Sequence, residues 1–235
     1  MRLDAITFDI DDTLWDNAPV MQHLESEMML WLEREIAQPL QIGLSELQQR
    51  RMQLGTELMS TPRRGDVTYV REQVTWQVLK EHGLSESAAD QLARRATEKM
   101  LELRHLVTPY PEVDALLAEL APHYRLAVIT NGNVDVNQLP LARHFDVIFK
   151  AGELGMPKPD HSIFLHTLQA LGGVAPEHAM HVGDSWTSDI EPAAALGMQA
   201  VWIDLFNEPR PLTEHIHRIE HVRELPQILR ALGRT

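Results

Sequence analysis

The stretch Leu3-Asp4-Ala5-Ile6-Thr7-Phe8-Asp9-Ile10-Asp11-Asp12-Thr13 (residues 3–13) is decisive for the fold. Residues 3–8 have the composition of a short buried strand, and this run ends abruptly on acidic residues. Asp9 and Asp11, two positions apart, point to the same side wherever the chain is extended. Because close carboxylates repel, one ionises easily and the other tends to keep its proton, which suits a nucleophile and a general acid/base. An ordinary acid-rich turn fits this stretch equally well. Only the rest of the sequence can distinguish a catalytic site from such a turn.

Residues 17–107 have helical periodicity throughout. Apolar residues recur three or four positions apart in three sets, namely Met21, Leu24, Met28 and Leu32; Val67, Val70, Val74 and Val78; and Leu92, Ala96, Met100 and Leu103. Residues suited to N-caps at Ser45, Asp66 and Ser85 divide the segment into about four helices. The loop 61–65 separates the second helix from the third.

From residue 108 onward, strand-like and helix-like segments alternate. The β-type runs are 126–130, 147–150, 179–182 and 200–203, and the helix-like segments lie near 111–120, 134–142, 160–171 and 189–196. This alternation predicts an α/β fold with a Rossmann-like parallel sheet. We therefore expect a catalytic core of residues 1–16 and 108–235, interrupted by a four-helix cap at 17–107. An insertion after the first strand would sit over the strands' carboxyl ends, where ligands bind in open α/β sheets.

Three later strand ends carry further polar residues. Thr130 and Asn131, before a glycine, are suited to hydrogen-bond phosphoryl oxygens. Lys158 stands between two prolines that keep its backbone extended, and a lysine fixed in this way can offset phosphoryl or carboxylate charge. Asp184, with Asp189 five residues later, offers the hard oxygen ligands that Mg²⁺ prefers. Taken singly, each has an ordinary structural explanation, but their joint order is distinctive.

The ordered set resembles the haloacid dehalogenase superfamily over nearly the whole chain, and residues 17–107 resemble that superfamily's C1-type helical cap. The resemblance implies that Asp9 attacks phosphorus, Asp11 acts as general acid/base, Thr130 and Asn131 bind the phosphoryl group and Lys158 offsets charge. The implied cofactor is Mg²⁺. Its implied ligands are Asp9, the backbone carbonyl of Asp11, and Asp184, with Asp189 close behind.

Asp11 separates two activities within this superfamily. Its dehalogenases have no Asp at this position and use no metal, because a departing halide needs no proton. Here both Asp11 and Asp184 are present. The resemblance therefore implies a Mg²⁺-dependent phosphomonoesterase with an aspartyl-phosphate intermediate, and makes a haloacid dehalogenase the less favoured alternative.

The substrate is expected to be a small phosphorylated metabolite. Residues 7–17, 129–133 and 181–190 resemble flavin-pathway phosphatases, which act on FMN or 5-amino-6-(5-phospho-D-ribitylamino)uracil. Phosphoglycolate or a sugar phosphate is the alternative, since these stretches surround a phosphoryl site that all such substrates share. In the cap, Arg63, Arg64, Arg71, Trp31, Tyr69 and Trp76 are candidate contacts, although solvated arginines and core aromatics explain them as well.

The composition limits which binding partners and which cellular location are expected for the protein. The net charge of −13, from 21 basic and 34 acidic residues, disfavours nucleic acid and anionic membranes as partners. There are no cysteines, and residues 1–4 do not resemble a signal peptide. No apolar run is long enough to span a bilayer. We therefore expect a soluble, cytoplasmic protein whose oligomeric state the sequence leaves open.

Three further interpretations fit parts of the sequence but not the whole. A phospho-accepting signalling domain carries its phosphorylated aspartate on a later strand and lacks a helical cap, and an inactive binding protein would not need the full acid set. His217 and His221 would share a helix face at a spacing that some zinc sites use, but no third ligand is evident.

Overall fold

The computed structural model describes residues 2–233, and its internal contacts divide the chain into two units. The α/β unit comprises Met1–Asp16, Thr108–Asn131 and Asp135–Thr235, and the helical unit comprises Asn17–Val107 and Gly132–Val134. Residues 1, 234 and 235, which belong to the predicted core, lie outside the described residues. The role of 17–107 as a cap stays a prediction.

Within the described part of the α/β unit, six parallel strands form one sheet in the order β3-β2-β1-β4-β5-β6. The strands are β1 (Ala5–Phe8), β2 (Arg125–Thr130), β3 (Val147–Lys150), β4 (Ala179–Gly183), β5 (Gln199–Ile203) and β6 (Ile216–Ile219). The order reverses between β1 and β4, which are neighbours, and this is where ligands bind in such sheets. The sheet confirms the predicted Rossmann-like α/β fold.

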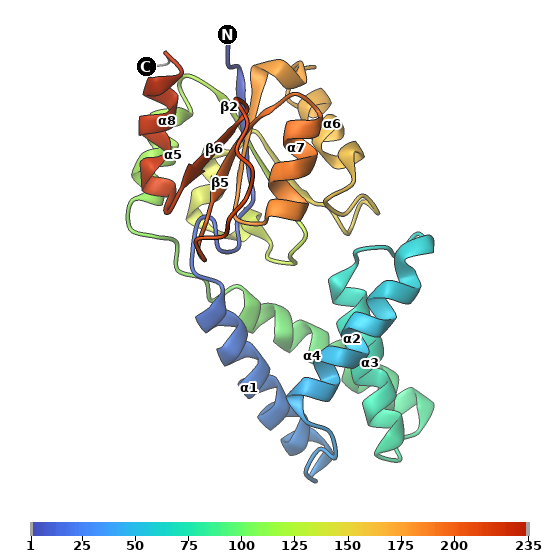
Figure 1. Cartoon of the computed structure of the whole chain (residues 1–235). Coiled ribbons are helices and arrows are strands. Elements are labelled where there is room, and N and C mark those ends of the chain that lie inside the picture. Colours follow the sequence, from blue (N-terminus) through green and yellow to red (C-terminus); the bar gives the residue numbers. More distant parts are fainter. Residues whose placement is uncertain (1, 234–235) are drawn as a thin grey trace. The chain divides into compact units, whose positions relative to one another are not determined.

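Helices cover both faces of the sheet. Figure 1 shows α5 (Val113–Leu120) and α8 (Leu225–Ala231) on one side, and α6 (His161–Ala170) and α7 (Glu191–Ala195) on the other. A buried apolar cluster joins α6 and α7 to the sheet, and it includes Ile129, Phe164 and Met198. Because helices cover the sheet on both sides, β1 is buried along its whole length, and three of its four residues are apolar.

Two predictions in the α/β unit are wrong. Residues 134–142 form no α-helix, but two 3₁₀ turns at Val136–Gln138 and Pro140–His144. Pro140 has no N–H to donate and disfavours a helical conformation at Leu139 before it, so one continuous helix could not form.

The C-terminal histidines are the other correction. Residues 216–219 form the edge strand β6, so His217 and His221 do not share a helix face. The buried Ile216 and Ile219 pack this strand against the sheet, and His217 Nε2 bonds to Gln199 Oε1 at 2.7 Å. The short apolar-polar run had too few residues to distinguish a strand from a helix.

The helical unit contains four α-helices among its described residues, as predicted. They are α1 (Ala18–Ile36), α2 (Leu44–Glu57), α3 (Val67–Glu81) and α4 (Glu86–Arg104). Helix α4 packs on α1 and α3, and α2 packs on α3. The side chains of Asp66 and Ser85 cap α3 and α4 as expected, but Gly43, not Ser45, precedes α2.

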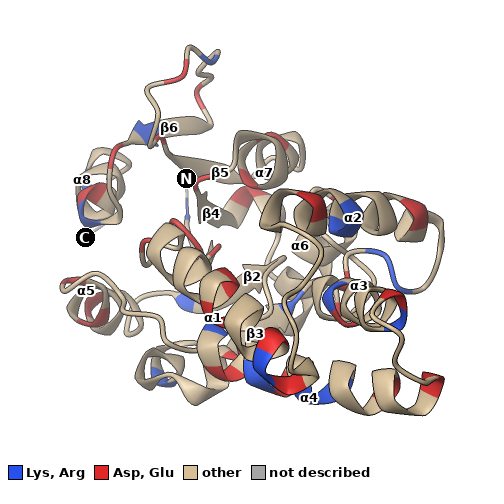
Figure 2. Cartoon of the chain, turned by 90° about the horizontal axis from the view of Figure 1, so that it is seen from below, with Lys and Arg blue, Asp and Glu red and all other residues tan. Residues whose placement is uncertain are grey.

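Surface charge is spread over both units. Figure 2 shows acidic residues on helices of each unit instead of one concentrated patch. Among the helices of residues 2–233, none combines the length and apolar character needed to cross a membrane.

Candidate active site

Asp9 and Lys158 form a buried ion pair at the carboxyl end of the sheet. Asp9 directly follows β1, and its backbone N–H extends the pairing with β4 by donating to Val182 O at 2.9 Å. Lys158 Nζ lies 2.5 Å from Asp9 Oδ1 and 2.6 Å from Asp189 Oδ1. The lysine side chain is only 2% exposed, so its ammonium group is paired with these two carboxylates and not with solvent.

Asn131 holds the Lys158 backbone in place. Its Nδ2 donates to Lys158 O at 2.9 Å, and its Oδ1 accepts from Lys158 N at 2.8 Å. The two reciprocal bonds connect the end of β2 to the loop that carries the lysine. The sequence predicts Asn131 as a phosphoryl ligand, whereas here both polar atoms of its amide hold Lys158.

Asp189 is the most extensively bonded carboxylate of the site. It lies in a short π-helical turn, Trp186–Ile190, after β4. Besides Lys158, its Oδ1 contacts His181 Nε2 at 3.1 Å, and its Oδ2 accepts from Ser185 N at 3.1 Å. A Cβ added at Gly183 would lie 2.5 Å from Asp189 Cγ, so only glycine leaves room for this carboxylate.

His181 is a site residue to which the sequence analysis assigned no role. It is fully buried on β4, opposite Thr7 of β1, and its Nδ1 lies 2.8 Å from Thr7 Oγ1. Burial lowers the pKa of His181, so the ring is neutral and its Nε2–H donates to Asp189. Nδ1 then accepts from the Thr7 hydroxyl. A detectable signal was present, because Thr7 and His181 are polar residues inside otherwise apolar strands.

The remaining predicted residues also lie at the carboxyl end of the sheet. Thr130 is buried at the end of β2. Asp11 is half-buried, and its Oδ1 accepts from Trp15 Nε1 at 2.9 Å, which orients the carboxylate. Asp184 follows β4, and its backbone carbonyl accepts from Trp202 Nε1 at 2.9 Å. A left-handed residue, Asp12 with φ 57°, allows the sharp turn after β1.

The carboxylates exceed the positive charge available to them. Burial raises the pKa of Asp9 well above its ordinary value, with Asp189 and Asp11 adding to the effect against Lys158. Burial, aided by Asp189 and Asp12, raises the pKa of Asp184 to about 7. Burial alone would raise the pKa of Asp189 as well, but Lys158 and His181 outweigh it and lower the pKa to about 2.

One carboxylate oxygen from each of three residues lies within 4.8 Å of the other two, and these residues are Asp9, Asp184 and Asp189. Carboxylate oxygens at this spacing suit a hard divalent cation such as Mg²⁺. The excess of negative charge agrees with such an ion. Since Asp189 already uses both oxygens for hydrogen bonds, Asp9 and Asp184 are the better direct ligands.

The chain is similar to known proteins both in sequence and in structure. The family model of the haloacid dehalogenase-like hydrolases matches residues 3–197. A 5-amino-6-(5-phospho-D-ribitylamino)uracil phosphatase of Escherichia coli is 30% identical over 86% of this chain and 84% of its own length. A phosphoserine phosphatase of Thermus thermophilus is 38% identical, over 57% of this chain and 54% of its own. The crystal structure of a 2-haloacid dehalogenase from Pseudomonas syringae has a TM-score of 0.86 and 34% identity, covering 98% of this chain and 99% of that one.

Proposed function

Because this chain belongs to the haloacid dehalogenase-like hydrolase family, we propose that it is a Mg²⁺-dependent phosphomonoesterase that works through an aspartyl-phosphate on Asp9. Family membership confirms the predicted superfamily and the prediction of a hydrolytic enzyme, and relatives named as phosphatases agree with its predicted type. We propose, in addition, the identity of the metal, the covalent intermediate and the substrate.

The observation that carries the proposal is the Asp9–Lys158 pair beside a second and a third carboxylate. A nucleophilic carboxylate must be ionised and close to positive charge, because it approaches an anionic phosphoryl group. Lys158 Nζ, at 2.5 Å, supplies one such charge. Lys158 alone cannot offset Asp9, Asp184 and Asp189 together, which supports a requirement for a cation.

The donor set of the site fits Mg²⁺. Asp9 and Asp184 would hold the ion together with the backbone carbonyl of Asp11, while Asp189 would keep Lys158 in position. When bound, Mg²⁺ neutralises charge on the phosphoryl oxygens and lowers the pKa of Asp9 and Asp184.

The residues of the chain divide the reaction into two steps. In the first, Asp9 Oδ2 attacks phosphorus in line, the bond from phosphorus to the ester oxygen breaks, and Asp11 gives its proton to the departing alcohol. In the second, the ionised Asp11 takes a proton from water, whose oxygen attacks phosphorus and releases phosphate from Asp9. Trp15 holds Asp11 through its indole N–H, and Thr130 lies at the adjoining strand end to bind phosphoryl oxygen.

For the substrate, we propose a small phosphorylated metabolite, with FMN or 5-amino-6-(5-phospho-D-ribitylamino)uracil as the first candidates. Similarity to the E. coli phosphatase supports them. Phosphoglycolate or a sugar phosphate is the alternative, and the 38% identity with the phosphoserine phosphatase adds phosphoserine to the panel. A cytoplasmic location belongs to the same proposal.

A dehalogenase is the second candidate, since the similar P. syringae protein is named a 2-haloacid dehalogenase. Halide displacement needs no acid for its leaving group. The oriented Asp11, which has no leaving group to protonate in such a reaction, and the relatives named as phosphatases distinguish the two activities. They favour the phosphatase.

The test is a hydrolysis assay on p-nitrophenyl phosphate, FMN, the pyrimidine phosphate, phosphoglycolate, phosphoserine and 2-chloropropionate, each with MgSO₄ and with EDTA in a chloride-free buffer. We expect phosphate release that requires Mg²⁺ and no release of chloride. Chloride release without phosphate release would establish the dehalogenase instead. Turnover of phosphoglycolate alone would retain the reaction and exclude the flavin-pathway substrates.

A further inference from the structure

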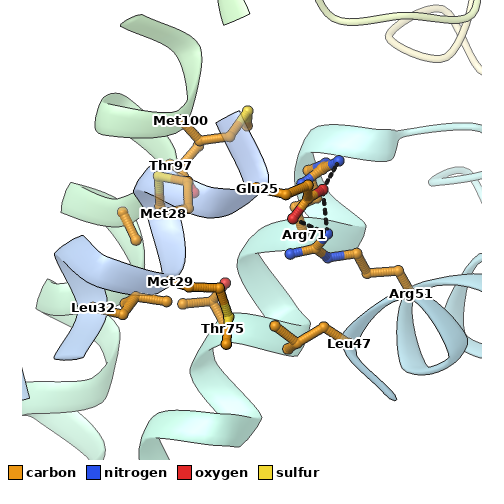
Figure 3. Close-up of a pocket in the computed structure, with 11 residues that line it drawn as sticks. Glu25, Met28, Met29, Leu32, Leu47, Arg51, Arg71, Thr75, Thr97 and Met100 are labelled. Carbon is orange, nitrogen blue, oxygen red and sulfur yellow. Dashed lines mark hydrogen bonds and ion pairs between the residues drawn. The ribbon is translucent and has the colours of Figure 1, made fainter. Parts of the chain in front are cut away.

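The helical unit buries a cluster of three charged side chains, drawn in Figure 3. Glu25 of α1 lies between Arg51 of α2 and Arg71 of α3. Arg51 Nη1 donates to Oε1 of Glu25 at 2.7 Å and to Oε2 at 2.9 Å, and Arg71 Nη2 donates to the same Oε1 at 2.7 Å. Two guanidinium groups therefore share one carboxylate, and the triad carries one surplus positive charge.

This surplus lies away from water. The side chains of Glu25, Arg51 and Arg71 are 7%, 16% and 17% exposed. Burial and the charge of Arg51 lower the pKa of Arg71, although Glu25 opposes them. Each charge buried to stabilise a fold needs an opposite charge beside it. This cluster holds two bases and one acid, so an anion that entered it would be stabilised.

Hydrogen-bond donors remain available in the triad. Nε of Arg51 is buried and has no hydrogen-bond partner within residues 2–233. Arg71 uses only Nη2 for Glu25, although a guanidinium group offers five N–H donors. Such donors are suited to the paired oxygens of a carboxylate or phosphate.

A hollow beside the triad has room for a ligand. The hollow is lined by the triad together with Met21, Gln22, Ser26, Leu44 and Gln48, and its volume is about 550 Å³. This lies within the usual size of small-molecule pockets, about 300–1,000 Å³. On its other side the triad borders a narrow apolar cavity of about 20 Å³, with Met28 and Leu32 in its wall, that has space for little more than one water. The larger hollow is therefore where an anion can enter.

We propose that Arg51 and Arg71 form a binding site for the carboxylate or phosphate group of a small molecule, in the hollow of the helical unit. The bound oxyanion supplies the missing negative charge and accepts from the Arg71 donors that Glu25 leaves unused. Gln22, Ser26 and Gln48 add polar groups at its rim. The anion belongs either to a second acidic group of the substrate, which rests on the proposed function, or to a separate metabolite, which does not.

Malonate binding to the full chain tests the site. Calorimetric titration is done in EDTA, because without a metal the excess carboxylates of the α/β unit repel anions. Wild type is expected to bind malonate, and Arg71→Gln to bind it about tenfold more weakly, the value of one charge-assisted hydrogen bond. Glu25→Gln removes the competing carboxylate and is expected to bind about tenfold more tightly. Arg95→Gln, which changes an exposed arginine of the same unit, is expected to match wild type.

Two results would overturn the site: no malonate binding by either wild type or Glu25→Gln, or equal affinity in wild type, Glu25→Gln and Arg71→Gln. The gain expected of Glu25→Gln does not depend on Arg71→Gln being well folded. Arg71→Lys, which keeps the charge and loses the planar fork, is expected to bind with intermediate affinity.

A kinetic comparison identifies the source of the anion. If the site takes a second acidic group of the substrate, Arg71→Gln raises KM for phosphoglycolate about tenfold and leaves KM for p-nitrophenyl phosphate unchanged. If it takes a separate metabolite, malonate affinity falls and both KM values stay the same. A chain that hydrolyses no phosphate ester contradicts the proposed function alone, since malonate binding is measured without catalysis.

Discussion

The α/β unit and the helical unit each bury a charged cluster, and the two clusters are unbalanced in opposite directions. At the sheet edge, Lys158 serves Asp9 and Asp189 with Asp184 nearby, so negative charge is in excess. In the helical unit, Glu25 serves two arginines, so positive charge is in excess. Folding alone gains little from either imbalance, because an uncompensated buried charge is costly. The sign of each excess instead indicates the ligand, a cation in one unit and an anion in the other.

The largest effect is expected from the nucleophile. Asp9→Asn should lower kcat on p-nitrophenyl phosphate by about 10⁴-fold, since an amide cannot form the covalent intermediate. Its melting temperature should change little, because Lys158 keeps its second carboxylate partner, Asp189. Asp90→Asn makes the same chemical change at an exposed position and should retain full activity. An Asp9→Asn enzyme with more than a tenth of wild-type activity would contradict the assignment.

Charge balance in the helical unit predicts which variant loses more stability. Glu25→Gln leaves two buried guanidinium groups unopposed and should cost about 3 kcal/mol in the free energy of unfolding, measured in urea. Arg71→Gln leaves a balanced pair of Glu25 and Arg51 and should cost less than half as much. Equal losses in the two variants would mean that the surplus positive charge does not affect the free energy of unfolding.

Close contact at Gly183 makes catalysis sensitive to one methyl group. Gly183→Ala should displace Asp189, and with it Lys158, and lower kcat by about 10²-fold, as expected when catalytic groups are misplaced by an ångström. The matched change Gly55→Ala adds a methyl group where nothing lies within 4 Å, and should leave kcat unaltered. Activity of Gly183→Ala near that of wild type would show that Asp189 is not held as described.

Without metal, pH should affect the two clusters in opposite ways. The folded pKa of Asp184, about 7, exceeds its ordinary value of 3.8, so protonation of this group stabilises the fold fully below pH 3.8, and this contribution is lost as pH rises from there through 7. In EDTA, unfolding free energy should fall by about 2 kcal/mol between pH 5 and 8, and less in Asp184→Asn.

Glu25 provides the contrast. Burial raises its pKa, but Arg71 and Arg51 outweigh burial and bring the pKa below its ordinary 4.5. Its contribution is therefore complete above pH 4.5 and declines only as pH falls below that value. Glu25→Gln should leave the slope between pH 5 and 8 unchanged. A wild-type stability that is flat over this range in EDTA would contradict the account of Asp184.

The smallest effect is expected at His181, which acts through Asp189. His181→Leu should lower kcat about tenfold with little change in KM, because the Asp189 carboxylate loses one of its bonds while the phosphoryl site stays open. His181→Gln, which keeps an N–H donor, should recover part of kcat. An increase in KM alone would point to general loosening of the site.

The sequence revealed more of the α/β unit than of the helical unit, for physical reasons. Polar residues at strand ends must meet at one edge of a parallel sheet, so Asp9, Thr130, Lys158 and Asp184 could be grouped from their order alone. Helix periodicity reveals that a face is apolar, but not which charged residues of different helices meet. The triad of Glu25 with Arg51 and Arg71 joins residues 26 and 46 positions apart. No local pattern indicates such a contact.

Errors arose where signals were short. Pro140 breaks a segment whose apolar spacing otherwise fits a helix, and β6 is only four residues long. Asn131 is a different case: its role as a phosphoryl ligand stays a prediction, although its amide bonds the Lys158 backbone. Residue type suggested its chemistry, and only the tertiary structure revealed its partner.

The most direct test of the central claim is to trap the phosphorylated enzyme. The full chain is mixed with p-nitrophenyl phosphate and MgCl₂, quenched in acid during turnover, and digested for mass spectrometry. We expect one added phosphoryl group, on Asp9, absent from Asp9→Asn and from samples in EDTA. A phosphoryl group on any other residue, in an enzyme that hydrolyses the substrate, would contradict it.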